Sequence, residues 1–147
     1  DDGPPEGVVR VSEADPDGFL QDVQSGPTTH IYADEPKEFG GTNRGLSPYG
    51  LLAAGLGACT SMTIRMYARR KSWPLDQVTV DVTHNKVHAQ DAETGQSNRI
   101  DTFVRTIGLV GDLDEAQSQR LMEIADKCPV HQTLEHGARV QTKQRAE

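Results

Sequence analysis

The chain has 147 residues, which is the size of one ordinary domain, and 35% of them are apolar, which suffices for one core. Its 22 acidic and 15 basic residues give a net charge of −7, which argues against nucleic acid or an anionic membrane as the main partner. No run of about 18 apolar residues is present, so the sequence predicts no membrane-spanning helix.

Two cysteines, Cys59 and Cys128, are too few for a disulfide scaffold, so we expect a cytoplasmic protein in which the pair is catalytic, redox-active or simply buried. We expect one domain over residues 1–147. Its acidic, Pro- and Gly-rich start, residues 1–7, is expected to be flexible or a linker, and the sequence leaves open whether another domain precedes it.

The first third of the chain predicts a meander of two or three antiparallel strands. The segments are "GVVRVSEA" at 7–14, "FLQDVQSG" at 19–26 and the β-branched "TTHIYADEP" at 28–36, with a turn signal at 16–18. A loop rich in turn residues, "GGTNRGLSP" at 40–48, follows this meander.

A long helix is predicted from about residue 48 to 71. Ser47 can serve as its N-cap and Pro48 as its first residue. The first half of the helix is apolar nearly all round, and it contains Gly50, Gly55 and Gly57, so we expect it to be central and closely packed against another helix or backbone. A chain of this size covers such a helix poorly by itself, which favours a homodimer.

The rest of the chain predicts two long strands, at 75–89 and 98–111, with the hairpin tip at 90–97. An amphipathic helix over 112–128 follows, capped by Asp112 or Asp114, and "HGARVQTK" at 136–143 is predicted to be a final strand. The predicted fold class is α+β, with antiparallel sheet wrapped around or beside a central helix.

The two cysteines differ in their predicted surroundings. Cys128 precedes Pro129 and can be the N-cap of a short helix "PVHQTLE", where the free N–H groups lower a thiol pKa. Cys59 lies about three turns into its helix, where the dipole effect has faded, so position alone favours a structural role. A disulfide is possible if the two helices pack with the Cα atoms within about 7 Å.

A metal site built on Cys128 and His131 is not expected, because no second paired ligand motif exists. No phosphate-binding loop, Ser–His–Asp order or carboxylate pair stands out either, so the sequence predicts no metal and no cofactor.

Two segments carry a family resemblance. The chain resembles the OsmC/Ohr family in "GGTNRGLSPYGLLAAGLGACTSMTIRMYARRKSWPL" at 40–75 and in "ADKCPVHQTL" at 125–134. The resemblance is to a branch of the family in which some members are fused to an α/β-hydrolase domain. The resemblance covers roughly residues 30–143. It implies an interlocked homodimer in which antiparallel sheets wrap around two long central helices.

The resemblance also implies a chemistry. A peroxidatic cysteine matching Cys59 attacks the O–O bond of an organic hydroperoxide, and a resolving cysteine matching Cys128 then forms a disulfide that an external dithiol reduces. The helix N-terminus alone would instead favour Cys128 as the attacking thiol. Peroxidase members pair the thiolate with an Arg, for which Arg44 is the candidate and Arg10 another, and carry a Glu after the helix Pro, where this chain has Tyr49 and Gly50.

The function predicted first is therefore a thiol-dependent organic hydroperoxide reductase of oxidative stress defence. Its apolar substrate pocket would be lined by helix residues, namely Leu52, Leu56, Met62, Tyr67 and Tyr49. The alternative is a non-catalytic domain of the same fold, with inert cysteines, that binds a small ligand or serves an attached partner. A redox sensor would use the same chemistry, but the sequence offers no DNA-binding element for it.

Overall fold

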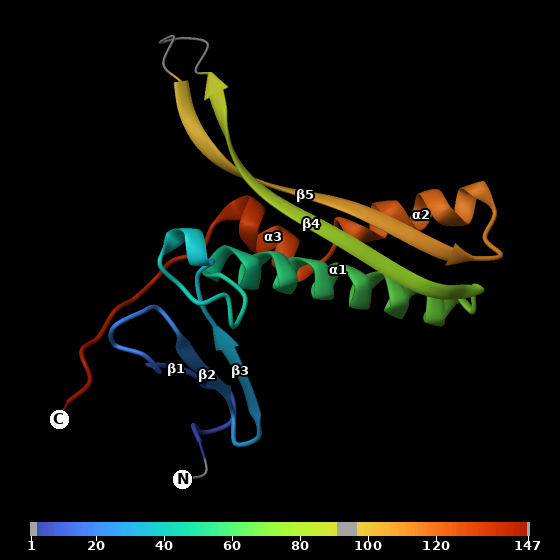
Figure 1. Ribbon diagram of the computed structural model, residues 1–147. Coiled ribbons are helices and arrows are strands. Elements are labelled where there is room, and N and C mark those ends of the chain that lie inside the picture. Colours follow the sequence, from blue (N-terminus) through green and yellow to red (C-terminus); the bar gives the residue numbers. More distant parts are fainter. Residues whose placement is uncertain (1–2, 91–96, 147) are drawn as a thin grey trace. The chain divides into compact units, whose positions relative to one another are not determined.

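The computed structural model describes residues 3–90 and 97–146, with the side chains of 87–90 and 97–99 left undescribed (Figure 1). The chain divides into two compact units, residues 1–52 and 53–147, which we describe one at a time. The elements follow in the order β1 Val9–Glu13, β2 Gln21–Ser25, β3 Thr29–Ala33, the 3-10 turn η1 Lys37–Phe39, α1 Pro48–Lys71, β4 Leu75–Gln90, β5 Ser97–Gly111, α2 Glu115–Ala125 and α3 Pro129–His136.

The first unit contains a three-stranded antiparallel sheet in the order β1-β2-β3. Val11 pairs with Val23, and Val23 with Ile31, so the β-branched residues of the three strands lie side by side across the sheet. The predicted meander is thus confirmed, because short alternating strands joined by turn residues favour this local topology.

The loop at 40–47 leads from the first sheet into α1 and is organised by one buried carboxylate, Asp34. This carboxylate accepts hydrogen bonds from the backbone N–H of Glu35 at 2.8 Å, of Thr42 at 3.1 Å and of Arg44 at 3.2 Å, and from the Thr42 hydroxyl at 2.6 Å. These donors hold the pKa of Asp34 below its usual value, the Thr42 hydroxyl contributing most.

Helix α1 begins and ends where the sequence predicts. The Ser47 hydroxyl oxygen accepts a hydrogen bond from the Gly50 N–H at 3.1 Å, as expected of an N-cap followed by Pro48. Only one face of the helix is buried by its own chain, through Leu56, Gly57, Thr60, Ile64 and Ala68. Of the three helix glycines, Gly57 faces β4, where a Cβ would be in ordinary contact with a Val82 methyl group at 3.4 Å, whereas a Cβ at Gly55 would meet open space.

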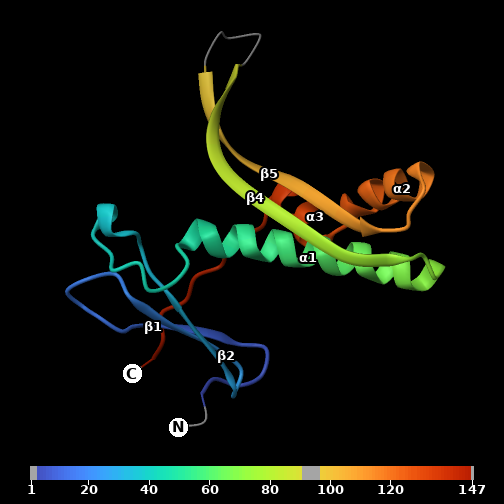
Figure 2. The same cartoon turned by 45° about the vertical axis from the view of Figure 1, so that its right-hand side comes forward.

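The second unit is built on a long antiparallel hairpin of β4 and β5, in which Val80 pairs with Ile107 and His84 with Phe103. Helix α1 runs alongside this hairpin in both ribbon views (Figure 2). Residues of α1, β4 and α2 form one buried cluster, made of Ile64, Ala68, Leu75, Leu121 and Ala125. Helix α2 is capped by Asp114, one of the two predicted caps, which accepts the Gln117 N–H at 2.7 Å.

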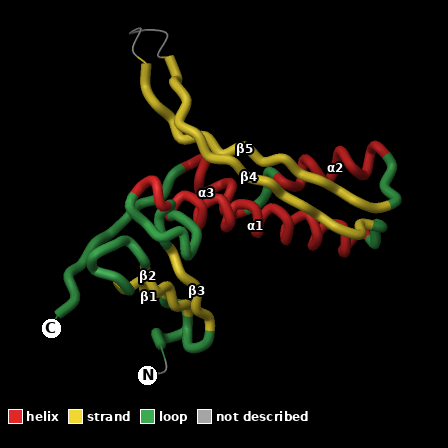
Figure 3. Tube along the Cα trace, in the orientation of Figure 1, coloured by secondary structure: helices red, strands yellow, loops and turns green. Residues whose placement is uncertain are grey.

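The prediction of a final strand at 136–143 is wrong. Helix α3 continues through His136, and residues 137–146 form neither helix nor strand (Figure 3). The segment alternates, but Val140 is its only large apolar residue and it is exposed, so pairing as a strand would bury little. Of the hairpin tip predicted at 90–97, Gln90 and Ser97 belong to β4 and β5, and residues 91–96 lie outside the described part of the chain, as do the first two residues of the predicted linker.

Candidate active site

Cys128 is fully buried and forms the N-cap of α3, as its place before Pro129 predicts. Its Sγ accepts a hydrogen bond from the His131 backbone N–H at 3.4 Å. The cap therefore places the sulfur at the positive end of a helix, where the free N–H groups stabilise an anion.

Cys59 lies on α1, and its thiol interacts directly with that of Cys128. Burial raises the pKa of Cys59, and the neighbouring Cys128 raises it further, against smaller opposing effects of the Val130 N–H and the Thr63 hydroxyl. Both cysteines are free thiols, and Cys59 is the partly exposed one of the two.

The pKa of Cys128 is shifted the other way. Burial by itself would raise this pKa, but hydrogen bonds from Cys59, the His131 N–H, the Thr60 hydroxyl and the Val130 N–H outweigh burial, so the pKa is lowered. Of the two sulfurs, the buried one at the helix N-terminus is therefore the better site for a negative charge, which agrees with the expectation from helix position.

Arg105 contacts Thr60, a neighbour of the cysteine pair, and was not among the site residues predicted from the sequence. It lies on β5, and its guanidinium donates to the Thr60 hydroxyl oxygen at 3.0 Å, to the Ala125 carbonyl oxygen at 2.9 Å and to the Asp126 carboxylate at 2.8 Å. A signal was present in the sequence, because an alternating strand puts Arg105 on the same face as Phe103 and Ile107.

A cavity of about 510 Å³ lies beside this network in the second unit. Leu56, Arg105 and His131 belong both to its wall and to the surroundings of the cysteines. Its other lining residues are Ile100, Asp101, Thr102, Phe103, Val104, Leu134 and Glu135. Five of these lining residues are apolar and five are polar or charged, so the wall is mixed and could hold an organic ligand that carries polar groups.

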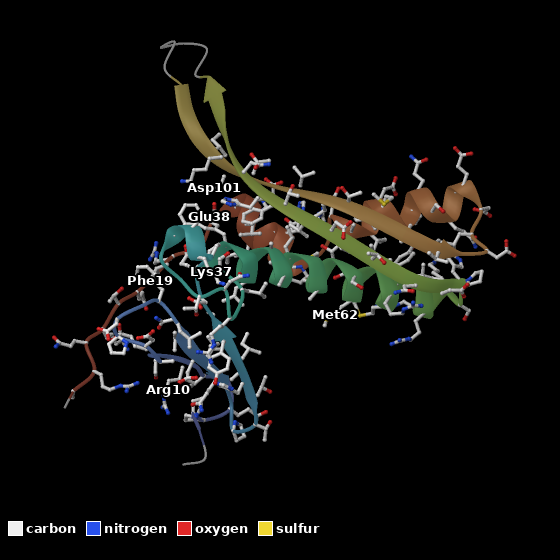
Figure 4. All side chains as sticks on the ribbon, in the orientation of Figure 1. Arg10, Phe19, Lys37, Glu38, Met62 and Asp101 are labelled. Carbon is white, nitrogen blue, oxygen red and sulfur yellow. The ribbon has the colours of Figure 1, made fainter. Side chains whose placement is uncertain are left out.

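The predicted pocket residues are not all brought together. Leu56 lines the cavity, whereas Met62 is 69% exposed and points away from the β4–β5 hairpin (Figure 4). Tyr49 and Leu52 belong to the first unit, where Tyr49 lines a smaller cavity of about 340 Å³ with Phe39 and other residues.

The two candidate arginines also belong to the first unit. The Arg44 guanidinium lies 5.6 Å from the centre of the Tyr32 ring, in a cation–π contact. Arg10, on β1, has a buried Nε atom for which the described residues provide no hydrogen-bond partner.

Neither a metal site nor a membrane-spanning helix is present among the described residues, 3–90 and 97–146. No group of three or more His, Cys, Asp or Glu side chains among them is placed to hold a metal ion. None of the helices described there has the length and apolar character needed to cross a bilayer.

The sequence profile of the OsmC-like protein family matches residues 41–143, and the chain belongs to this family. No curated protein matches the chain. Solved structures share the fold at sequence identities of 23% or less, so they bear on architecture alone.

One such structure is a candidate osmotic stress induced and detoxification response protein from Psychrobacter arcticus 273-4, with 23% identity, a TM-score of 0.69 and coverage of 89% of this chain and 90% of the other. An organic hydroperoxide resistance protein OsmC from Legionella pneumophila has 19% identity, a TM-score of 0.61 and coverage of 86% and 88%. An organic hydroperoxide resistance protein from Elizabethkingia anophelis has 20% identity, a TM-score of 0.60 and coverage of 86% and 87%. These likenesses agree with the α+β fold of antiparallel sheets and helices that the sequence predicts.

Proposed function

We propose that this protein is a thiol-dependent peroxidase that reduces organic hydroperoxides in oxidative stress defence, using Cys59 and Cys128. The observation that carries the proposal is the direct interaction of two thiols that lie far apart in the sequence. Family membership and the names of the Legionella and Elizabethkingia neighbours support it.

In the proposed cycle Cys59 is the peroxidatic residue and Cys128 resolves. The Cys59 thiol passes its proton to the Cys128 thiolate, and the Cys59 sulfur attacks the terminal oxygen of the hydroperoxide. The O–O bond breaks, Cys59 becomes a sulfenic acid, and the alkoxide leaves as an alcohol with the proton from Cys128. The Cys128 thiolate then attacks the Cys59 sulfur and expels hydroxide, which is protonated to water, leaving a disulfide that an external dithiol reduces.

Access and acidity divide the two roles. Cys59 is partly exposed while Cys128 is fully buried, so a hydroperoxide can reach Cys59 first. The lowered pKa of Cys128 suits a group that accepts the Cys59 proton and later acts as a nucleophile itself. Arg44 is kept as a proposed partner of the Cys59 thiolate, on the strength of the family resemblance.

A homodimer is part of this proposal. The face of α1 turned away from the buried one carries exposed apolar residues, with Leu52 at 46%, Met62 at 69% and Met66 at 55% exposed. At Gly55 the space where a Cβ would lie is open. A helix face of this kind on an acidic chain is well suited to pack against the same helix of a second copy.

The test counts free thiols and measures intact mass before and after one equivalent of cumene hydroperoxide. We expect the wild type to lose both thiols and two hydrogen atoms in mass. Cys59→Ser should not react, and Cys128→Ser should stop at a sulfenic acid on Cys59 that dimedone traps. Survival of both thiols in excess hydroperoxide would overturn the proposal.

A second candidate function is a non-catalytic domain that binds a small ligand. Three observations favour it: the cavity of about 510 Å³ near the cysteines, the raised pKa of Cys59, and the lack of a Glu after Pro48. A ligand that copurifies with the protein and is released on denaturation, with both thiols inert, would support this function over the first.

A further inference from the structure

Arg105 is nearly enclosed, with only 12% of its side chain exposed, so its buried positive charge requires an explanation. Its guanidinium joins β5 to α1 through Thr60 and to the C-terminal end of α2 through Ala125 and Asp126. A buried guanidinium is costly unless it is paired and hydrogen-bonded, and here a carboxylate, a hydroxyl oxygen and a carbonyl oxygen accept hydrogen bonds from it.

Thr60 connects this arginine to the cysteine pair. Its hydroxyl is fully buried, donates to the Leu56 carbonyl oxygen at 2.7 Å and accepts from Arg105 at 3.0 Å. A hydroxyl has one proton and two lone pairs. The same hydroxyl also contacts the Cys128 sulfur, so its proton can turn from the Leu56 carbonyl to that sulfur while Arg105 continues to donate to the oxygen.

The other groups around Cys128 favour the same outcome. The groups that interact with its sulfur are the Cys59 thiol, the Thr60 hydroxyl and the backbone N–H groups of Val130 and His131. The charged groups on the adjoining elements are Arg105 on β5, Asp126 and Lys127 before the cysteine, and His131 and Glu135 on α3. The Asp126 carboxylate is paired with Arg105 at 2.8 Å, and the His131 ring lies 3.7 Å from the Glu135 carboxylate. The backbone N–H groups of His131 and Val130 donate to this sulfur, and the Thr60 hydroxyl can do so when its proton turns away from the Leu56 carbonyl oxygen.

We propose that Arg105 is a positioning residue of the cysteine pair, which through Thr60 keeps a hydrogen-bond donor on the Cys128 sulfur and stabilises that sulfur as a thiolate. The inference deepens the proposed peroxidase function, because the proposed cycle needs Cys128 first as a proton acceptor and then as a nucleophile. The lowered pKa of Cys128 agrees with it. Arg105 fixes the hydroxyl oxygen and polarises its O–H bond, without itself touching either sulfur in the proposed role.

The test follows the ionisation of Cys128 in a Cys59→Ser background, where Cys128 is the only thiol, by the ultraviolet absorbance of the thiolate as pH is raised. We expect Arg105→Met and Thr60→Val each to raise the titration midpoint by about one pH unit, which lowers the thiolate-to-thiol ratio at neutral pH about tenfold. Thr60→Ser keeps the hydroxyl and should restore a midpoint near that of the parent.

Arg65→Met is the matched control, because Arg65 is also a partly buried arginine that donates to a backbone carbonyl, that of Leu75 at 2.6 Å. We expect it to leave the Cys128 midpoint unchanged. Thr60→Val nearly preserves the shape of the side chain and removes its hydroxyl. It therefore tests the connection from Arg105 through Thr60 to Cys128 even if circular dichroism shows that Arg105→Met does not fold. An unchanged midpoint in folded Thr60→Val, or an equal shift in Arg65→Met, would overturn the inference. No peroxide is used, so the result stands apart from whether the protein is a peroxidase.

Discussion

At the scale of single residues, the two sulfurs divide acidity and access between them. Cys128 has the donors, at a helix N-terminus and from the Thr60 hydroxyl, while Cys59 has partial exposure and a pKa raised by burial and by its neighbour. A thiolate on one sulfur disfavours a second on the other, so the pair holds one negative charge more readily than two.

Removing Cys128 should therefore make Cys59 more acidic. In Cys128→Ala the burial effect on Cys59 remains but the effect of the neighbouring sulfur is gone, so we expect the pKa of Cys59 to fall and its alkylation at neutral pH to become severalfold faster. Iodoacetamide modification followed by mass over a pH series measures this. Thr63→Val supplies a control of opposite sign, because the Thr63 hydroxyl lowers the Cys59 pKa. An unchanged or slower reaction in Cys128→Ala would contradict the coupling.

Arg44 and Arg105 are proposed to affect different cysteines, so replacing them should have different effects. If Arg44 stabilises the Cys59 thiolate as proposed, Arg44→Gln slows the oxidation of Cys59 by cumene hydroperoxide about tenfold and leaves the Cys128 titration unchanged. Arg10→Gln, the other candidate from the family resemblance, is the comparison. Stopped-flow oxidation rates decide the matter, and equal rates for Arg44→Gln and the wild type would remove Arg44 from the site.

At the scale of elements, local signals predicted local structure. The start of α1 follows from Ser47 and Pro48, the start of α2 from Asp114 and the start of α3 from Cys128, because each cap bonds to a residue three positions along the chain. The residues near 140 alternate like a strand, but a strand also needs a partner and a surface to bury, and these depend on distant residues.

Arg105 escaped prediction for the same reason. Its hydrogen-bond partners, Thr60, Ala125 and Asp126, come from two other parts of the chain, and no spacing in the sequence predicts these contacts. Its place between Phe103 and Ile107 on one strand face indicated burial of the charge but did not identify what the charge would bind. For the cysteine pair the sequence indicated only that a contact was possible if the two helices pack together.

The loop before α1 should depend on the ionised form of Asp34. The folded pKa of Asp34 is lowered by its hydrogen bonds, so its contribution to stability is present above its unfolded value, about pH 4, and is lost as pH falls through the lower folded value. Asp34→Asn should lower the melting temperature at pH 7 and show a weaker loss of stability on acidification than the wild type. Asp22→Asn, at an exposed carboxylate paired with His30, is the control and should cost less. Equal acid sensitivity of the wild type and Asp34→Asn would be evidence against this role.

At the scale of the whole molecule, the chain leaves α1 half covered. The buried face carries Ile64 and Ala68, which pack with residues of α2 and the strands, whereas the opposite face exposes Met62 and Met66. Methionine is flexible and packs well against irregular apolar surfaces, so such a face favours association with another helix. The sequence indicated this through an apolar pattern nearly all round the first half of the helix, but it could not say which face the chain itself would cover.

A charge placed on the exposed face of α1 should therefore separate two copies of the chain. We expect the wild type to sediment as a dimer and Met62→Glu to weaken dimerisation at least about a hundredfold, because an unpaired carboxylate would have to be buried in the interface. Met122→Glu places the same charge at a methionine of α2 that is 44% exposed and should leave the dimer intact. Sedimentation velocity over a concentration series distinguishes the two variants. A monomeric wild type would remove the homodimer, and a dimer that tolerates both changes would place its interface away from this face of α1.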